Sequence, residues 1–219
     1  MLAPASINPF HGRRFAFLLG FLVLLVLIVP AFGDDPKGEA DVSLLFSVVV
    51  LGFATAARRT LLASAFVAVW LVLTWLRPLG ATAAGEIATD IALLAVCLIT
   101  IESALRRALR PGDVDAEMLC AAVSAYMIMG VGWAAVYTAL QTADPGAFAL
   151  QGADAEAPWS ALLYFSFATL TTLGYGDISP ASSYGRAFAT VEAVSGTVYL
   201  AILIAYLVSN FRGRGEAET

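Results

Sequence analysis

The segment 171–177, with the sequence TTLGYGD, has residue types that suit ion coordination by the backbone. Gly174 and Gly176 alternate with Tyr175, and glycine adopts backbone angles that other L-residues resist. A strand of this kind can turn successive carbonyl oxygens toward one axis, where they replace the water around a dehydrated potassium ion. The carbonyls expected to form these stacked oxygen rings are those of Thr172, Leu173, Gly174 and Tyr175.

A closed ring of carbonyls around an ion needs four copies of this segment. The chain of 219 residues contains one copy and no internal repeat of it. We therefore expect a homotetramer. Its stacked carbonyl rings would form an ion-selective filter that ends at Gly176, and the Thr172 hydroxyl would add an oxygen at the inner end. Potassium ions are the expected bound group, and no organic cofactor is expected.

The composition places this segment in a membrane protein. Hydrophobic residues make up 60% of the chain and charged residues only 13%, and the mean hydropathy is +0.83. A soluble domain carries about 25% charged residues. With one histidine, and with Cys97 and Cys120 in or beside apolar runs, no catalytic set or zinc site is expected. The absence of a basic stripe argues against nucleic-acid binding, so neither an enzyme nor a nucleic-acid partner is predicted.

Six apolar runs are long enough, or nearly so, to cross a bilayer as helices, which takes about 20 residues. We therefore predict an all-α polytopic membrane protein surrounded by lipid. The six predicted spans are residues 15–32, 42–57, 60–76, 87–105, 117–140 and 185–210.

A seventh apolar run, 158–170, is too short to span, and glycine-rich sequence follows it. Irregular backbone at membrane depth is tolerated only where protein surrounds it or where it lines a water-filled cavity. The run therefore predicts a re-entrant pore helix that leads into the filter.

The basic residues fix the orientation. With alternating spans, nine of the 12 basic residues fall on one side, which the positive-inside rule assigns to the cytoplasm. Both termini are then cytoplasmic in the cell (inner) membrane. The predicted domains are a cytoplasmic N-terminus (1–14), a four-helix sensor-like domain (15–110), a pore domain (111–211) and a short cytoplasmic tail (212–219).

The segment Thr172–Gly176 resembles the T-x-G-Y-G filter of tetrameric potassium channels of the voltage-gated-like six-helix superfamily, bacterial ion-channel type. Leu173 stands where valine is most common, and leucine keeps the carbonyl in place. Two features outside the filter extend the resemblance, the aromatic pair Tyr164-Phe165 in the pore helix and the aspartate that follows the filter.

The resemblance implies a supporting shell around the filter. It implies that Tyr175 and Asp177 bond to the pore helix and hold the filter open, and Tyr164 is the hypothesised partner of Asp177. The residues predicted to support the filter are Thr171, Tyr164, Phe165 and Asp177.

The sixth predicted helix carries the gating candidates. Gly196 falls at the hinge-glycine spacing of these channels, although a close-packing glycine is an equal alternative. The apolar stripe Leu200, Ile204 and Val208 suits a constriction that gates by dewetting, with ordinary helix packing as the alternative.

Glu192 lies one helical turn before Gly196, within an apolar span. A carboxylate in that position must be paired, hydrated or protonated. We expect either a structural brace to the pore helix, with Ser166 or Thr169 as partner, or a proton-sensing role.

Two other functions fit parts of this pattern. A non-selective cation channel usually departs from the Gly-Tyr-Gly core, which this chain keeps. A non-conducting regulatory membrane subunit is also compatible, because a sequence does not demonstrate conduction.

The fourth predicted span, 87–105, contains no lysine or arginine, and Arg106, Arg107 and Arg110 follow only at its inner end. Each charge moved through the membrane field contributes about 2.3 kcal/mol per 100 mV, so steep gating needs several mobile charges per subunit. We predict weak voltage dependence in conductance–voltage recordings. A curve whose slope requires several gating charges per channel would contradict this.

Overall fold

The part of the chain that the structure, a computed structural model, describes is almost entirely helical. It comprises residues 14–32, 68–70, 72, 74, 82–109, 115–150 and 158–215, with the side chains of 29–32, 208 and 210–215 left undescribed. The elements are α1 (Arg14–Phe32), α4 (Ala83–Ala108), α5 (Ala116–Ala143), β1 (Phe148–Leu150), α6 (Trp159–Leu170), β2 (Ile178–Pro180) and α7 (Ser183–Gly215).

Three of the described helices are long and apolar enough to cross a membrane: α4, α5 and the Ser183–Leu207 part of α7. The apolar part of α1, Arg14–Ile28, is shorter. The predicted spans 42–57 and 60–76 lie outside the described residues, apart from 68–70, 72 and 74. The prediction of six spans therefore remains a prediction.

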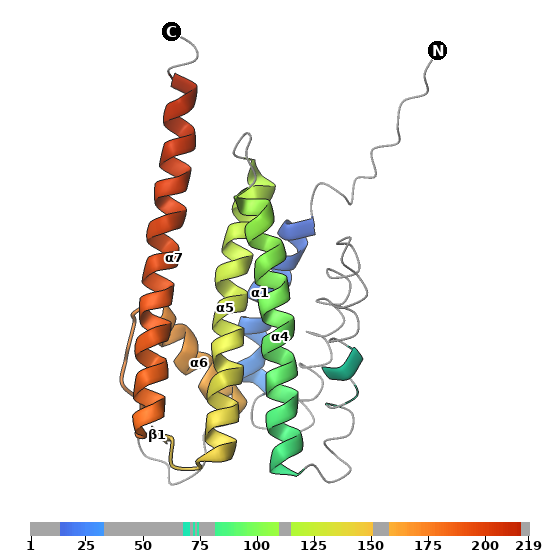
Figure 1. Cartoon of the computed structure of the whole chain (residues 1–219), viewed down its shortest axis with the longest axis vertical. Helices are drawn as coiled ribbons and strands as arrows, with labels where there is room; N and C mark the ends of the chain where they lie inside the picture. Colours follow the sequence, from blue (N-terminus) through green and yellow to red (C-terminus); the bar gives the residue numbers. More distant parts are fainter. Residues whose placement is uncertain are drawn as a thin grey trace.

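Helices α4 and α5 form an antiparallel pair, with α1 packed on α5 (Figure 1). Small residues of the pair permit close approach of the two backbones. The alanines of this pair that are at most 1% exposed are Ala104, Ala108, Ala121, Ala122, Ala125, Ala134 and Ala135.

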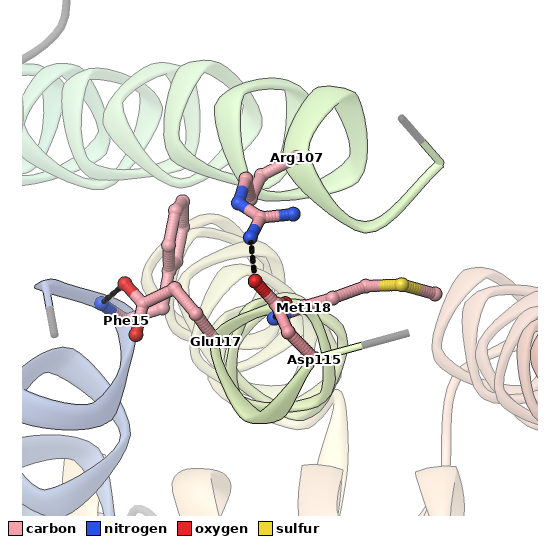
Figure 2. A network of polar contacts seen from close by, with 5 residues as sticks. All are labelled: Phe15, Arg107, Asp115, Glu117 and Met118. Carbon is pink, nitrogen blue, oxygen red and sulfur yellow. Dashed lines mark hydrogen bonds and ion pairs between the residues drawn. The ribbon is translucent and has the colours of Figure 1, made fainter. Parts of the chain in front are cut away.

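Polar contacts fasten the end of this pair where α4 stops and α5 begins (Figure 2). Asp115 is the N-cap of α5, and its Oδ1 accepts from the Met118 N–H at 2.7 Å. Its other oxygen binds the Arg107 guanidinium of α4 at 2.6 Å. Glu117 Oε1 accepts from the Phe15 N–H at 2.7 Å, which satisfies a free donor in the first turn of α1.

In the half of the chain that the sequence predicts to be the pore domain, here called the pore half, the short helix α6 lies between α5 and α7 (Figure 1). The strands β1 and β2 pair antiparallel, with Phe148 opposite Pro180 and Leu150 opposite Ile178. This two-stranded ladder is a small departure from the all-α expectation. It joins the chain after α5 to the chain that follows the candidate filter, on either side of α6 and residues 171–177.

Helix bounds differ from the predictions by a few residues. Helix α6 begins at Trp159 with Pro158 as its N-cap, and it ends at Leu170 as the sequence predicts. Helix α7 starts at Ser183, before the predicted 185, and continues to Gly215, into the segment predicted as a tail.

The Asp115→Ala variant is expected to lower the free energy of unfolding by about 1 kcal/mol, because it removes the N-cap of α5. Asp115→Asn keeps a capping oxygen and loses only the charge beside Arg107. That pair is exposed, so its loss should cost less than the cap. Thermal unfolding of the purified protein in detergent measures both, and equal losses for the two variants would contradict this ranking.

The pKa of Asp115 lies below its ordinary value, first because its carboxylate accepts the Met118 N–H and also because Arg107 lies beside it. A group with a lowered pKa contributes stability above its unfolded pKa of about 3.9 and loses it as the pH falls through the folded-state pKa. Below about pH 4, wild type should therefore lose stability relative to Asp115→Asn. Parallel melting profiles across acid pH would contradict this.

Candidate functional site

The last turn of α6 turns the chain into the segment 171–177. The N–H of Thr171 donates to Phe167 O at 3.0 Å, and the N–H of Thr172 donates to Thr169 O at 3.0 Å. The N–H groups of Leu173 and Gly174 then both donate to Ala168 O, at 2.8 and 3.1 Å. The final carbonyls of the helix thus hold the first half of the segment against the helix end.

The backbone of this segment alternates in φ. Positive φ occurs at Thr172 (60°), Gly174 (54°) and Gly176 (80°), and at no other position in the described parts of the chain. The two glycines adopt these angles freely, whereas a β-branched threonine at positive φ is a true outlier that costs about 1–3 kcal/mol. Strain of this kind persists only where the surroundings impose it, and it is concentrated at functional sites.

The carbonyls of Thr172, Leu173, Gly174 and Tyr175 accept no hydrogen bond from the residues that the structure describes. Backbone carbonyls are strong acceptors, so four successive carbonyls without a partner in the chain are open to water or to a cation. All residues of 171–177 are exposed in the single chain, with Tyr175 70% exposed. The segment is therefore a row of oxygen atoms open to one side.

The predicted supporting residues do not form one cluster. Tyr164 of α6 and Asp177 lie close enough to interact electrostatically, and the hydrogen bond hypothesised between them remains a prediction. The Thr171 hydroxyl donates to Phe167 O at 2.7 Å. The Tyr175 side chain makes no hydrogen bond within the described residues, so its predicted bond to a pore helix remains a prediction.

Phe165 packs away from the filter strand. Its ring meets Tyr137 and Phe148 edge to face, with centroids 5.1 and 5.3 Å away. Phe165 therefore joins α6 to α5 and to β1, and any support that it gives the filter is through the position of α6.

Gly196 of α7 lies against the end of α6. A Cβ atom at Gly196 would lie 2.4 Å from the Leu170 carbonyl oxygen, far inside contact distance. The same oxygen accepts from the Tyr126 hydroxyl of α5 at 3.0 Å. The close approach explains why position 196 is a glycine without invoking a hinge, although it does not test one.

The remaining gating candidates lie in the C-terminal half of α7. Leu200 is 40% exposed and Ile204 is 61% exposed in the single chain. Val208 lies within α7, but its side chain is outside the described part of the structure. Their assignment to a constriction remains a prediction.

Glu192 is fully buried where α5, α6 and α7 meet. Its carboxyl group lies in hydrogen-bond contact with the Tyr137 hydroxyl and, at 2.5 Å, with the Ser166 hydroxyl. Ser166 is one of the two partners that the sequence suggested, whereas no hydrogen bond joins Thr169 to Glu192 in the described part of the chain. Sequence reasoning missed Tyr137, Tyr126 and Tyr199, although a tyrosine hydroxyl inside an apolar span signals that it needs a partner.

In the described ranges, no group of three or more His, Cys, Asp or Glu residues is arranged to hold a metal ion. The backbone oxygens of 172–175 are the candidate ligands in this part of the chain.

Comparison with known proteins finds a local likeness to ion channels. A family model described as "Ion channel" matches residues 125–212, the stretch from α5 to α7. The A-type voltage-gated potassium channels KCND3 of Rattus norvegicus and Homo sapiens are each 37% identical over 51 residues, which is 23% of this chain. These matches support an ion channel of the potassium-channel type. With its apolar helices, the chain is a multi-pass membrane protein.

The likeness is local. The chain matches only about 8% of the length of these curated relatives. No solved structure matches the chain significantly.

Gly196→Ala is expected to lower the free energy of unfolding by at least about 1–3 kcal/mol, because the new methyl group overlaps the Leu170 carbonyl. Gly132→Ala is the matched control, since a Cβ there would first meet another atom at an ordinary 3.4 Å. Melting temperatures of the purified proteins compare the two. A Gly196→Ala protein as stable as wild type would contradict close packing at this position.

Proposed function

We propose that this protein is a potassium-selective channel that conducts the ion passively through a filter built from residues 172–176 of four identical chains. The observation that carries the proposal is the row of four free carbonyls at Thr172–Tyr175, held in a backbone of alternating φ. Stacked carbonyl rings replace the hydration shell of potassium and form the selectivity filters of potassium channels.

The position of α6 also suits a cation. A helix carries about half a negative elementary charge at its C-terminal end. Helix α6 ends at Leu170, directly before the filter segment, so that its negative end faces the row of carbonyls. The helix thereby favours a positive ion at the inner end of the filter.

The surface of α7 supports an assembly of several chains. Only 11% of its spanning segment is buried in the single chain, against 56% for α5. Lipid can cover such a surface, but the exposed filter residues need water, ions or protein beside them. A fourfold arrangement places the filter on a common axis and lets α7 line the pathway below it.

Gating and orientation complete the proposal. Helix α4 has no basic residue before Arg106 and Arg107 in its last turn, so that we propose a channel without steep voltage dependence. These arginines lie at the same end of the bundle as the start of α5 (Figure 1). By the positive-inside rule, that end lies on the cytoplasmic side of the cell membrane.

Potassium flux into liposomes that contain the purified protein tests the proposal. Wild type should pass potassium but little sodium, and barium should block the flux. Gly174→Ala should abolish selective flux, because an L-residue at φ +54° costs about 1–2 kcal/mol and disturbs the carbonyl row. Its folding should persist, since a Cβ there meets nothing within 4 Å in the single chain.

Gly20→Ala is the control for this experiment. A Cβ at Gly20 also meets nothing within 4 Å, but Gly20 lies in the helix α1 without a positive φ. Its flux should equal that of wild type. Equal sodium and potassium flux in wild type would favour a non-selective cation channel, and absent flux from folded protein would favour a regulatory subunit.

A further inference from the structure

Glu192, Ser166 and Tyr137 form a buried cluster of oxygen atoms. It has more close oxygen–oxygen contacts than its two hydroxyl groups have hydrogens to fill. Three oxygen–oxygen contacts join this cluster: Tyr137 Oη with Glu192 Oε2, Ser166 Oγ with Glu192 Oε1, and Ser166 Oγ with Gly130 O. The two contacts of Ser166 measure 2.5 and 2.8 Å. At such distances each contact requires a hydrogen between its two oxygens.

The hydroxyls supply only two of these hydrogens. Tyr137 has one and Ser166 has one, whereas a backbone carbonyl and an ionised carboxylate have none. If Glu192 were ionised, Ser166 could donate either to Glu192 or to Gly130, and the other contact would bring two lone pairs together. A protonated Glu192 supplies the third hydrogen, and every contact is then satisfied.

Among the described elements packed against Glu192, no side chain offers a cation to an ionised carboxylate. The sequence contains no lysine or arginine between Arg110 and Arg186, so the elements α5 and α6 that pack against Glu192 have no basic side chain. Arg186 lies six residues earlier on α7, about 9 Å along the helix axis. Its guanidinium donates to Ala181 O at 2.7 Å and not to Glu192.

The titratable groups that face Glu192 are tyrosines. Tyr137 of α5 is in contact with Glu192, and Tyr126 of α5 lies within electrostatic range of it. From α6 the facing group is the Ser166 hydroxyl. Isolated buried carboxylates cost several kcal/mol or more unless they are paired with a cation, and in practice such groups take up a proton.

We propose that Glu192 is a neutral carboxylic acid in the folded protein, and that it donates its proton to Ser166 while Ser166 donates to Gly130 and Tyr137 donates to Glu192. The chain of donors runs from Tyr137 of α5 through Glu192 of α7 and Ser166 of α6 back to Gly130 of α5. It holds the helix that carries the filter at a fixed position between its two neighbours. Glu192 is thus a positioning residue, and its effect on conduction rests on the proposed channel function.

This arrangement makes the site sensitive to alkaline pH. Loss of the proton leaves a buried charge without a cation and leaves one contact of Ser166 without a hydrogen. The position of α6, and with it the filter, is then destabilised. The amide of Glu192→Gln provides the same pattern without a titratable proton, since its NH₂ donates to Ser166 and its oxygen accepts from Tyr137.

Infrared difference spectroscopy of the purified protein at neutral pH tests the protonation state without requiring conduction. Wild type should show a carbonyl band of a protonated carboxylic acid that Glu192→Gln lacks. Ser166→Ala should shift that band, because the acid loses its acceptor. Asp90→Asn, which changes another buried carboxyl, should leave the Glu192 band in place. Identical bands in wild type and Glu192→Gln would overturn the proposal.

Potassium flux across alkaline pH tests the positioning role. Wild-type flux should fall reversibly as pH rises, and Glu192→Gln should keep its flux over the same range. A wild-type profile that Glu192→Gln reproduces would overturn the positioning role. If folded protein conducts nothing at any pH, the proposed function fails, while the infrared result still decides the protonation of Glu192.

Discussion

The pore half of this protein depends on how the C-terminal turn of α6 satisfies its carbonyl groups. A helix leaves its last four carbonyls without an intrahelical partner, and at membrane depth water is scarce. Here Phe167 O and Ala168 O accept backbone N–H groups of the segment that follows, and Leu170 O accepts the Tyr126 hydroxyl. The helix end is thereby satisfied by the filter strand itself and by α5. Because these N–H groups are bonded to α6, the carbonyls of residues 172–175 stay open on the side where we propose the ion path.

The other contacts of the pore half follow from holding α6 between α5 and α7. Gly196 lets α7 reach the Leu170 carbonyl, and Ser166 and Glu192 join the middle of α6 to both neighbouring helices. The edge-to-face rings of Tyr137, Phe148 and Phe165 pack the outer side of the same junction. Glu192 is therefore a polar residue at a buried position in an apolar helix. The number of hydrogens that its contacts require favours the neutral carboxylic acid over the carboxylate, as we propose.

Much of the site could be predicted from the sequence because its signals are local. The alternation of Gly174 and Gly176 predicts a backbone with positive φ, and both have it. The short run before Thr171 predicts α6 and its end at Leu170. The positive φ of Thr172 could not be predicted, because it is imposed on a residue that avoids it. The partners Tyr126 and Tyr137 depend on how helices pack, and no local pattern encodes that pairing. The β1–β2 ladder was missed because three-residue strands leave too little alternation to detect.

The central claim is that residues 172–176 select potassium. The most direct measurement is the reversal potential of single channels of the purified protein in a planar bilayer, with potassium on one side and sodium on the other. The account predicts a reversal potential close to that of a membrane permeable to potassium alone. A reversal potential near zero in equal concentrations of the two ions would contradict it.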